Sequence, residues 1–287
     1  MVLFDTLQGR VNQALRMIKN DIHEIKTLPL SVAVITQNEA DNLPDCLKSV
    51  AFADQIVVVD SGSTDDTVKI ASDFGCDVFV ESWRGGFGAQ KQFAIDQCRQ
   101  SWVLVLDADE RIPPETASKI KQIISNTDIK TAGYSFPRKN FFQGRWIRHA
   151  GWWPDRIIRL FQKNLGHMTT ATVHEAIEVN GSVEALDVPI EHFTESSLSS
   201  ILLKIDKYSS LGAREAFAEG KKASNWSAVC RAFLVFSQDY ILRLGILDGP
   251  QGLTLAATDA VNKFFKYAKL AELCRQAQLN PQRDNRP

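Results

Sequence analysis

The sequence of 287 residues contains no long uninterrupted apolar run, no CxxC pair and no surplus of charge of either sign. Its 33 Lys and Arg residues against 34 Asp and Glu give a formal net charge of -1. This balance argues against a general attraction to nucleic acid or to membranes and leaves only local patches to act in that way. Segment 1–26 carries charges throughout, so we expect neither a secretory signal nor a membrane span there.

The cysteines are few, far apart and odd in number, which argues against a disulfide framework and against a zinc site. They are Cys46, Cys76, Cys98, Cys230 and Cys274. This usage fits a reducing compartment best. A GxGxxG motif is also missing after the first predicted strand, where the sequence reads TQNEAD, so a dinucleotide-dependent oxidoreductase is not expected.

Residues 1–26 repeat an apolar side chain every three or four positions, from Phe4 to Ile25. This spacing predicts one apolar stripe on a helix. Packing on its own domain is favoured over a coiled-coil arm, because the run is barely three heptads long. We therefore assign residues 1–28 to an N-terminal amphipathic helix.

From Leu30 onward, short β-branched runs alternate with amphipathic segments of helical length. The predicted strands are 30–36, 55–60, 76–81 and 102–107, and the predicted helices are 40–50, 65–74 and 86–98. This alternation predicts an α/β fold with a parallel sheet that is covered on both faces. Ser63 or Thr64 is expected to cap the second helix.

After Pro137 the alternation ends. Residues 138–163 are rich in aromatic and basic side chains and indicate irregular structure with a hairpin beside the sheet. From Leu198 the chain is predicted to be helical, in three segments broken near Gly220 and at 247–252. We therefore expect a catalytic α/β domain at 29–195 and a C-terminal helical region at 196–287.

Two carboxylates, Asp107 and Asp109, stand at the carboxyl end of the fourth predicted strand, WVLVLD. Residues two apart in an extended segment point to the same side, so the two groups would repel unless a cation lies between them. Oxygen ligands favour Mg²⁺ or Mn²⁺, and ligands of open α/β sheets bind beyond the carboxyl ends of the strands. The alternative is a solvated loop followed by a helix cap.

Two further loops carry groups suited to a phosphate-bearing ligand. Asp60 ends the second predicted strand, at the edge where a ribose or a base would lie. The glycines of WRGGFGAQKQFA, at 83–94, would bring backbone N–H groups against a phosphate, and Lys91 would add a positive charge. The alternatives are a turn that leads into a helix cap and a flexible loop before a helix.

Together, SVAVITQNEADNLPDCLKSV, IVVVDSGSTDDT, GFGAQKQFA and WVLVLDADE resemble the inverting family 2 glycosyltransferases with the GT-A fold. Downstream, RKNFFQGRWIRHAGWWPD, VHE and YAKL narrow the resemblance to the bacterial lipopolysaccharide core glucosyltransferases of the WaaE/LgtF type. Those enzymes pass glucose from UDP-glucose to the first heptose. The resemblance runs from about Leu30 to Leu273 and implies a Rossmann-like, mostly parallel central sheet with a C-terminal helical extension.

The resemblance also implies roles for individual residues on the donor side. Thr36, Asn38 and Glu39 would line the nucleotide pocket, and Lys91 would lie near the nucleotide. Asp60 would hold the uridine, although the family often has Asp-Asp where this chain has Asp60-Ser61. Asp107 and Asp109 would hold the ribose and the metal–diphosphate. The carboxylate base would be Glu175, with His174 as the second choice.

The acceptor is expected at the aromatic and basic stretch 138–163, which has seven Lys and Arg against one acid. Aromatic rings stack on sugars and guanidinium groups bind phosphate, and an inner-core lipopolysaccharide presents both. The expected acceptor residues are Arg138, Arg148, Trp152, Trp153, Arg156 and Arg159. Single-stranded nucleic acid uses the same chemistry, but a nucleotide-sugar site on a near-neutral chain disfavours it.

The C-terminal segment 221–275 carries eight Lys and Arg against four acids, together with several aromatic residues. Such helices bind an anionic membrane surface or simply pack on the catalytic domain. We expect a cytoplasmic enzyme that attaches peripherally to the inner face of the cytoplasmic membrane. The alternatives are a transferase for another lipid-linked or polysaccharide acceptor and a non-catalytic GT-A-fold protein that binds sugar or membrane.

Overall fold

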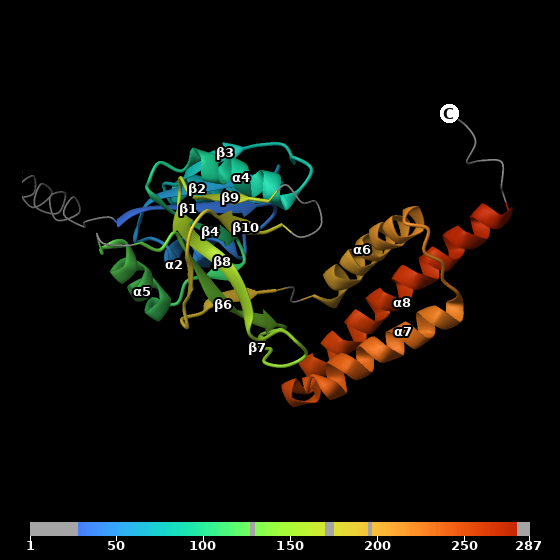
Figure 1. Ribbon diagram of the computed structural model, residues 1–287. Helices are drawn as coiled ribbons and strands as arrows, with labels where there is room; N and C mark the ends of the chain where they lie inside the picture. The colour runs from blue at the N-terminus through green and yellow to red at the C-terminus, as the bar shows by residue number, and fades with distance from the viewer. Residues whose placement is uncertain (1–27, 127–129, 170–174, 195–196, 280–287) are drawn as a thin grey trace, which may run out of the picture. The chain divides into compact units, whose positions relative to one another are not determined.

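The structure is a computed structural model that describes residues 28–126, 130–169, 175–194 and 197–279 (Figure 1). The predicted N-terminal helix therefore lies outside the described residues. The chain forms two compact units. The first comprises Met1–Ala108, Pro114–Tyr134 and Ile158–Glu184, and the second comprises Asp109–Pro113, Ser135–Ile157 and Ala185–Pro287.

Four parallel strands form the first half of the first unit, in the order β3-β2-β1-β4. They are β1 (Leu28–Thr36), β2 (Ala53–Asp60), β3 (Asp77–Val80) and β4 (Trp102–Asp107). All four predicted strands are confirmed, with ends that differ by at most two residues. In β1, β2 and β4 most of the β-branched and leucine side chains are buried, as expected for a parallel sheet with two covered faces, whereas β3 at the edge is partly exposed.

Helices connect these strands. They are α2 (Leu43–Ser49), α3 (Thr67–Asp73) and α4 (Phe87–Gln97). Helix α5 (Pro114–Ile124), which was not predicted, buries an apolar stripe that begins at Thr116 and includes Ile120 and Ile123. The expected cap of the second helix is wrong, because α3 begins three residues after Thr64 and the backbone N–H of Thr67 donates to the side chain of Asp65.

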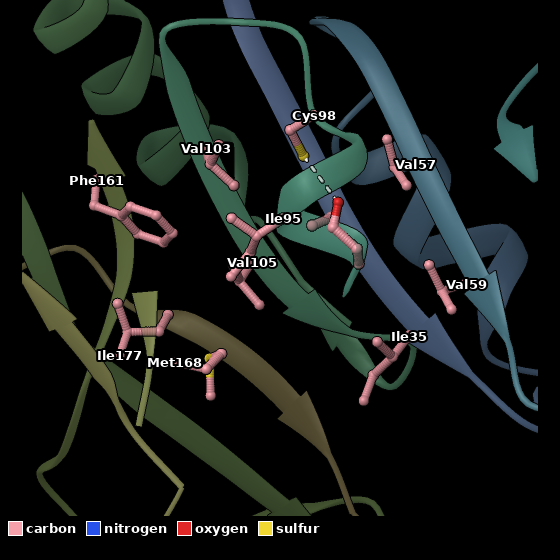
Figure 2. Close-up of a cluster of buried hydrophobic side chains, with 12 residues drawn as sticks. Ile35, Val57, Val59, Ile95, Cys98, Val103, Val105, Phe161, Met168 and Ile177 are labelled. Carbon is pink, nitrogen blue, oxygen red and sulfur yellow. Dashed lines mark hydrogen bonds between the residues drawn. The ribbon is translucent and has the colours of Figure 1, made fainter. Parts of the chain in front are cut away.

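Strand β4 also pairs with β8 (Asp155–Gln162), antiparallel, with Leu104 opposite Leu160. Strands β6 (Gly133–Phe142) and β8 each contribute residues to both units. A small hairpin of β9 (Gly166–Met168) and β10 (Ile177–Val179) completes the first unit. Its core lies between α4, the central strands and this hairpin, where Ile95, Val105 and Met168 gather (Figure 2).

The strands of the second unit place β12 (Ile190–Phe193) between β6 and β5 (Glu110–Arg111). Strand β12 runs parallel to β6 and antiparallel to β5. Strand β7 (Arg145–Trp146) folds back on β6 as the predicted hairpin, and β11 (Val183–Ala185) also pairs with β6. The sheet is therefore mixed, and its parallel part lies mainly in the first unit.

The C-terminal half of the second unit is helical, as predicted. It contains α6 (Leu198–Ala218), α7 (Asn225–Ser237) and α8 (Gly249–Leu279), with a π-helical turn, η1 (Gln238–Leu242), and a 3₁₀ turn, η2 (Gly245–Asp248), before α8. Helix α8 packs against both α6 and α7. Among the described residues, none of these helices combines the length and the apolar character needed to cross a bilayer.

Candidate active site

The carboxyl ends of three parallel strands meet at one edge of the first unit. Thr36 at the end of β1 lies opposite Asp60 at the end of β2, and Ile35 lies opposite Asp107 at the end of β4. In a parallel sheet the ends of neighbouring strands share an edge, so the loops that follow them also start there. This arrangement brings together the strand ends on which the predicted donor site depends.

Asp107 lies between two cations. Lys91 Nζ of α4 is 2.7 Å from Asp107 Oδ1, and Arg159 Nη2 of β8 donates to Oδ2 at 2.8 Å. Burial alone would raise the pKa of Asp107, but Lys91 and Arg159 outweigh that effect and hold the pKa below its usual range. The carboxylate is therefore charged, and both of its oxygens face protein cations.

Asp60 organises the turn that follows β2. Its side chain is fully buried, Oδ1 accepts from the backbone N–H groups of Gly62 and Ser63 at 2.9 and 2.8 Å, and Oδ2 accepts from the Ser63 hydroxyl. Gly62 has a φ of 90°, which glycine adopts without strain. The carboxylate thus fixes the shape of the loop, and its predicted contact with a uridine stays a prediction.

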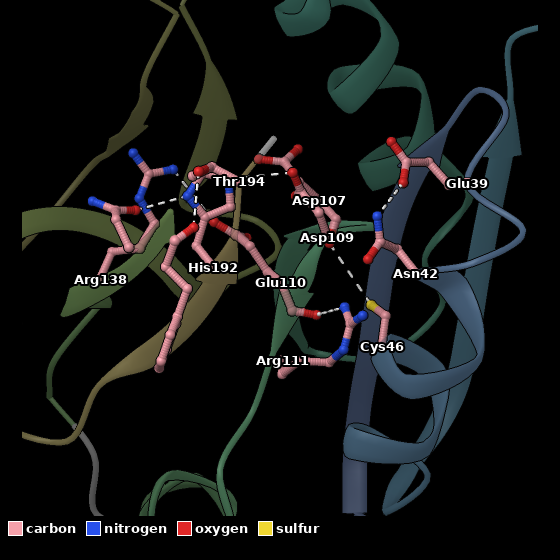
Figure 3. Close-up of polar contacts among 12 residues, drawn as sticks. Glu39, Asn42, Cys46, Asp107, Asp109, Glu110, Arg111, Arg138, His192 and Thr194 are labelled. Atoms are coloured by element: carbon pink, nitrogen blue, oxygen red, sulfur yellow. Dashed lines mark hydrogen bonds and ion pairs between the residues drawn. The ribbon is translucent and has the colours of Figure 1, made fainter. Parts of the chain in front are cut away.

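The loop after β1 is attached to the same turn. Asn38 adopts the left-handed conformation, its N–H donates to Ser63 Oγ at 2.7 Å, and its side-chain oxygen accepts from the N–H of Thr64 at 2.8 Å. Glu39 Oε2 accepts from Asn42 Nδ2 at 2.8 Å, as Figure 3 shows. The backbone N–H of Glu39 also donates to Thr67 Oγ1 at 2.8 Å. Asn38 and Glu39, both predicted to line the nucleotide pocket, therefore join the two loops.

Thr36 differs from these neighbours. The residue is only 5% exposed, and no described residue forms a hydrogen bond with its buried Oγ1. A buried hydroxyl without a partner costs about 1–3 kcal/mol. A polar ligand group at the end of β1 would remove that cost, which is consistent with the predicted place of Thr36 in the nucleotide pocket.

The glycine-rich loop lies against Glu175. A Cβ atom at Gly86 would stand 2.9 Å from Glu175 Oε1, and one at Gly88 would stand 3.4 Å from Glu175 Cγ. The loop is shaped by the buried Gln90, whose side chain accepts from the N–H of Arg84 and donates to the carbonyl of Glu81. The glycines therefore allow the backbone to approach the predicted base, while His174 lies outside the described residues.

In the second unit, Asp109 lies beside a histidine that the sequence did not indicate (Figure 3). His192 Nε2 is 3.3 Å from Asp109 Oδ2, and His192 Nδ1 is 2.7 Å from Asn140 Oδ1. The amide nitrogen of Asn140 donates to Asp155 and to the carbonyl of Trp152, so its oxygen accepts from His192. His192 Nδ1 therefore carries a proton and donates to Asn140, while Nε2 faces the carboxylate of Asp109.

The predicted acceptor residues are divided between the two units. Arg159 lies on Asp107 in the first unit, whereas Arg138 lies in the second, where it contacts Asp155 at 2.6 Å and Glu110 at 3.5 Å. Arg156 donates to the carbonyl of Leu186 and to Asp187.

The remaining three contact aromatic neighbours. The guanidinium of Arg148 lies 4.1 Å from the ring centre of Trp146, Trp153 meets the same ring edge-on, and Trp152 packs on Phe142. These contacts stabilise the stretch 138–163 itself and leave acceptor binding a prediction.

No described group of three or more His, Cys, Asp or Glu side chains converges as a ready metal site. The residue pair that best suits a metal, Asp109 with His192, was only half predicted. His192 stands in the sequence IEHF without a local motif around it. Its approach to Asp109 follows from the pairing of β12 with β5, which joins residues about 80 positions apart.

Known proteins resemble the chain over most of its length. The family model described as Glycosyl transferase family 2 matches residues 31–180. "Lipopolysaccharide core biosynthesis glycosyltransferase LpsC" of Rhizobium meliloti is 31% identical over 259 residues, which cover 86% of this chain and 93% of LpsC. An uncharacterized glycosyltransferase of Rickettsia typhi is 29% identical, with 85% and 87% covered.

Solved structures also resemble the chain. Residues 1–349 of S. aureus TarS in complex with UDP give a TM-score of 0.41 at 16% identity, with 87% of this chain and 92% of that chain covered. Glucosyl-3-phosphoglycerate synthase from Mycobacterium tuberculosis, in complex with Mn²⁺, UDP and glucosyl-3-phosphoglycerate, gives 0.41 at 15% identity, with 61% and 75% covered.

Proposed function

The chain belongs to glycosyl transferase family 2 and is a glycosyltransferase with a GT-A-like fold, and from this premise we propose the reaction. The enzyme transfers a hexose, namely glucose from UDP-glucose, to a heptose of the lipopolysaccharide inner core, with inversion at the anomeric carbon. The lipopolysaccharide core relative supports the acceptor class. The observation that carries the donor assignment is the Lys91–Asp107–Arg159 cluster at the strand edge.

The donor nucleotide binds at the carboxyl ends of β1 and β2. Thr36 offers its buried hydroxyl, Asn38 and Glu39 hold the two loops, and Asp60 keeps the turn in shape for a uridine. The ribose is assigned to the Asp107 carboxylate. Lys91 and Arg159 place two positive charges beside it, and these attract a diphosphate as well as neutralise the aspartate.

The residues present fit a divalent cation at Asp109 more closely than at Asp107. Both oxygens of Asp107 already face protein cations, whereas Asp109 faces the imidazole nitrogen Nε2 of His192 at 3.3 Å, and such a nitrogen can bind a metal. A positive charge joins this nitrogen to the carboxylate, and a divalent cation supplies it in place of a proton on Nε2. Asp109 and His192 would hold Mg²⁺ or Mn²⁺, and Asn140 would keep the imidazole in the ligating tautomer.

When bound, such a cation supplies Lewis-acid stabilisation of the departing diphosphate. The side chains perform the remaining work. Glu175 accepts the proton of the acceptor hydroxyl while that oxygen attacks the anomeric carbon from the face opposite the diphosphate, which inverts the configuration. Its position against Gly86 and Gly88 restricts where its carboxylate can move.

The acceptor side is assigned to the arginines and tryptophans of 138–163. Arg138, Arg148 and Arg156 offer guanidinium groups for core phosphates or carboxylates, and Trp152 and Trp153 offer rings for sugar faces. Because the acceptor is lipid-linked, we place the enzyme at the cytoplasmic face of the inner membrane as a peripheral protein. A nucleic acid partner is not part of this proposal.

The central experiment replaces Glu175 by Gln, which keeps the size of the side chain and removes its basicity. We expect kcat to fall about 10²–10⁴-fold, while calorimetry with UDP-glucose and Mg²⁺ or Mn²⁺ gives an unchanged Kd. Glu178→Gln is the matched control, because Glu178 is three residues away, exposed, and 3.5 Å from His167. Full transfer by Glu175→Gln would remove Glu175 from the mechanism.

Analysis of the reaction product identifies the acceptor. Mass analysis of truncated core acceptors should show one added hexose on a core whose outermost sugar is heptose, and a change of anomeric configuration should be visible by NMR. Donor-dependent product on another lipid-linked sugar, without product on the heptose acceptor, would replace the acceptor assignment and leave the transferase chemistry in place.

A further inference from the structure

Helix α7 has an unusual composition for a helix at the surface of a domain. Arg231 is its only charged residue between Asn225 and Ser237. Its inner face, where Ala228 is fully buried and Ala232, Val235 and Phe236 are half-buried, already packs in the second unit against α8. A helix that has buried one apolar stripe normally presents polar residues on the opposite face.

The outer face of α7 is apolar instead. Trp226 is 79% exposed and Phe233 is 69% exposed, and the same pattern continues through the π turn to Leu242, which is 78% exposed. We call the following set the α7 face. It consists of Trp226, Val229, Phe233, Leu234, Ile241 and Leu242. Because side chains three, four, seven and eight positions apart share one side of a helix, they form a stripe, and such exposed stripes mark interaction surfaces.

The segment that carries this stripe is mainly basic. Segment 221–247 holds four cations, namely Lys221, Lys222, Arg231 and Arg243, and a single acid, Asp239. The acid is buried and lies 3.0 Å from Arg243, so it adds no exposed negative charge. A tryptophan and bulky aliphatic side chains with flanking cations match the chemistry of an anionic lipid surface.

Arg243 of this segment and Asp248, the residue that follows the segment, contact the loop between β7 and β8. The buried carboxylate of Asp248 accepts from the backbone N–H groups of Arg148 and His149, at 3.2 and 2.9 Å, and His149 Nδ1 lies 3.1 Å from it. The carbonyl of Arg243 accepts from the N–H of Ala150 at 2.9 Å. Within the second unit, the aromatic and basic loop and the turn that ends the α7 face are therefore fastened together.

We propose that the α7 face inserts into the headgroup region of an anionic bilayer, and that the Asp248 and Arg243 contacts hold the loop between β7 and β8 next to that bilayer. The insertion itself is independent of the reaction. The role of the loop rests on the proposed function, since it concerns a lipid-linked acceptor. The occupant of the α7 face is a lipid surface, not a second copy of the chain.

The first test measures binding of the full chain to phosphatidylcholine vesicles with and without phosphatidylglycerol, in the absence of donor and acceptor. We expect binding that increases with the anionic lipid and decreases with salt. The double substitution Phe233→Ser and Leu242→Ser should weaken it at least about tenfold, since each buried apolar side chain contributes strongly to partitioning. Val80→Ser, at a 66% exposed valine of the first unit, is the matched control and should bind normally.

A fluorophore provides a second readout that does not depend on a variant's folding. Cys230 is exposed on α7, between the stripe residues Val229 and Phe233, so an environment-sensitive label there should shift to the blue on anionic vesicles. An absent shift together with absent binding would overturn the proposal. So would light scattering that shows a dimer in the wild type and a monomer in the double variant, because a second copy would then cover the face.

Transfer assays separate this inference from the proposed function. The double variant should transfer sugar to a water-soluble truncated acceptor at the wild-type rate and to an acceptor carried in vesicles at least about tenfold more slowly. Equal rates on both acceptors would overturn the inference and leave the transferase assignment intact. Vesicle binding without transfer to any core acceptor would overturn the proposed function and leave the membrane-binding inference intact.

Discussion

In the first unit one carboxylate, that of Asp107, lies against two cations, Lys91 and Arg159. In the second unit two carboxylates, those of Asp239 and Asp259, are close enough to repel each other, and one cation, Arg243, serves both. The pKa of Asp107 is accordingly held below its usual range. Burial and the Asp239 charge raise the pKa of Asp259 to about 6.

The two units therefore balance the charge of their buried acids differently, which suits different functions. The first unit keeps a permanently ionised carboxylate in a positive frame, which suits the binding of a charged diphosphate at neutral pH. In the second unit, Asp259 shares the single cation Arg243 with Asp239, so its negative charge is not fully balanced. The same unit exposes bulky apolar side chains on α7. The electrostatic cost therefore falls on an acid of the helical part, where the chain meets a surface in our proposal, whereas the charge of Asp107 at the strand edge is compensated by two cations.

The largest effect is expected from removing one cation of the first unit. Arg159→Met leaves the partly buried Asp107 with Lys91 alone, and breaking a buried pair costs about 3–5 kcal/mol. Because the native pKa of Asp107 is depressed, its contribution exists above the unfolded value of 3.8 and is lost as the pH falls below it. Urea unfolding should therefore show a large loss at pH 7 and a smaller one at pH 3.

Arg156→Met is the matched control on the same strand. Its partner Asp187 is almost fully exposed, so the pair should contribute at most about 1 kcal/mol. Equal destabilisation by the two substitutions would show that the methylenes of the arginines, not the charge cluster at Asp107, stabilise β8.

The next effect concerns catalysis without a comparable loss of stability. Gly86 has an extended backbone that any residue adopts, but the Cβ of Gly86→Ala would stand 2.9 Å from Glu175 Oε1. The flexible carboxylate should move away, and a displaced base costs about 10²-fold in kcat. Steady-state kinetics would measure the loss. Gly212→Ala, whose new Cβ meets only the flexible end of Lys266, should leave kcat unchanged.

A smaller effect is expected at the proposed metal site in the second unit. Asn140→Leu removes the oxygen that accepts from His192 Nδ1, so the imidazole loses its preferred tautomer and orientation. Calorimetry should show Mn²⁺ binding about 10–100-fold weaker in the presence of UDP. With a chelator present, UDP binding should match that of the wild type, and a weaker affinity there as well would indicate a general loss of the site.

The fold follows from the sequence where it depends on local pattern. The four parallel strands and their helices were predicted because β-branched runs and amphipathic segments alternate at short spacing. Strands β5 and β12 were not, since they have two and four residues and pair across about 80 positions. Helix α5 was missed although Thr116, Ile120 and Ile123 repeat at helical spacing, because the acidic motif before it was interpreted as a cation site and the helix cap was only the alternative.

The site divides in the same way. Asp107 and Lys91 were both predicted to lie at the donor site, because one ends a predicted strand and the other follows a glycine-rich loop. Arg159 was assigned to the acceptor, yet it lies on Asp107, because the antiparallel register of β8 with β4 places it there. His192 was missed for the same reason. Register depends on long-range pairing, which no single segment encodes.

The last prediction concerns Asp259 of the second unit, whose negative charge is only partly balanced by Arg243. Because the native pKa of Asp259, about 6, is above the unfolded value of 3.8, the stability that protonation provides is present below pH 3.8 and is lost as the pH rises through 6. Asp259→Asn keeps the shape and stays neutral. It should therefore stabilise the protein at pH 7.5, on the order of 1–2 kcal/mol, and change little at pH 4. Thermal unfolding at both pH values measures this. A variant that is less stable at pH 7.5 would mean that the attraction between Asp259 and Arg243 outweighs the repulsion between Asp259 and Asp239. The two units would then differ in the exposed apolar side chains of the α7 face but not in the compensation of their acids.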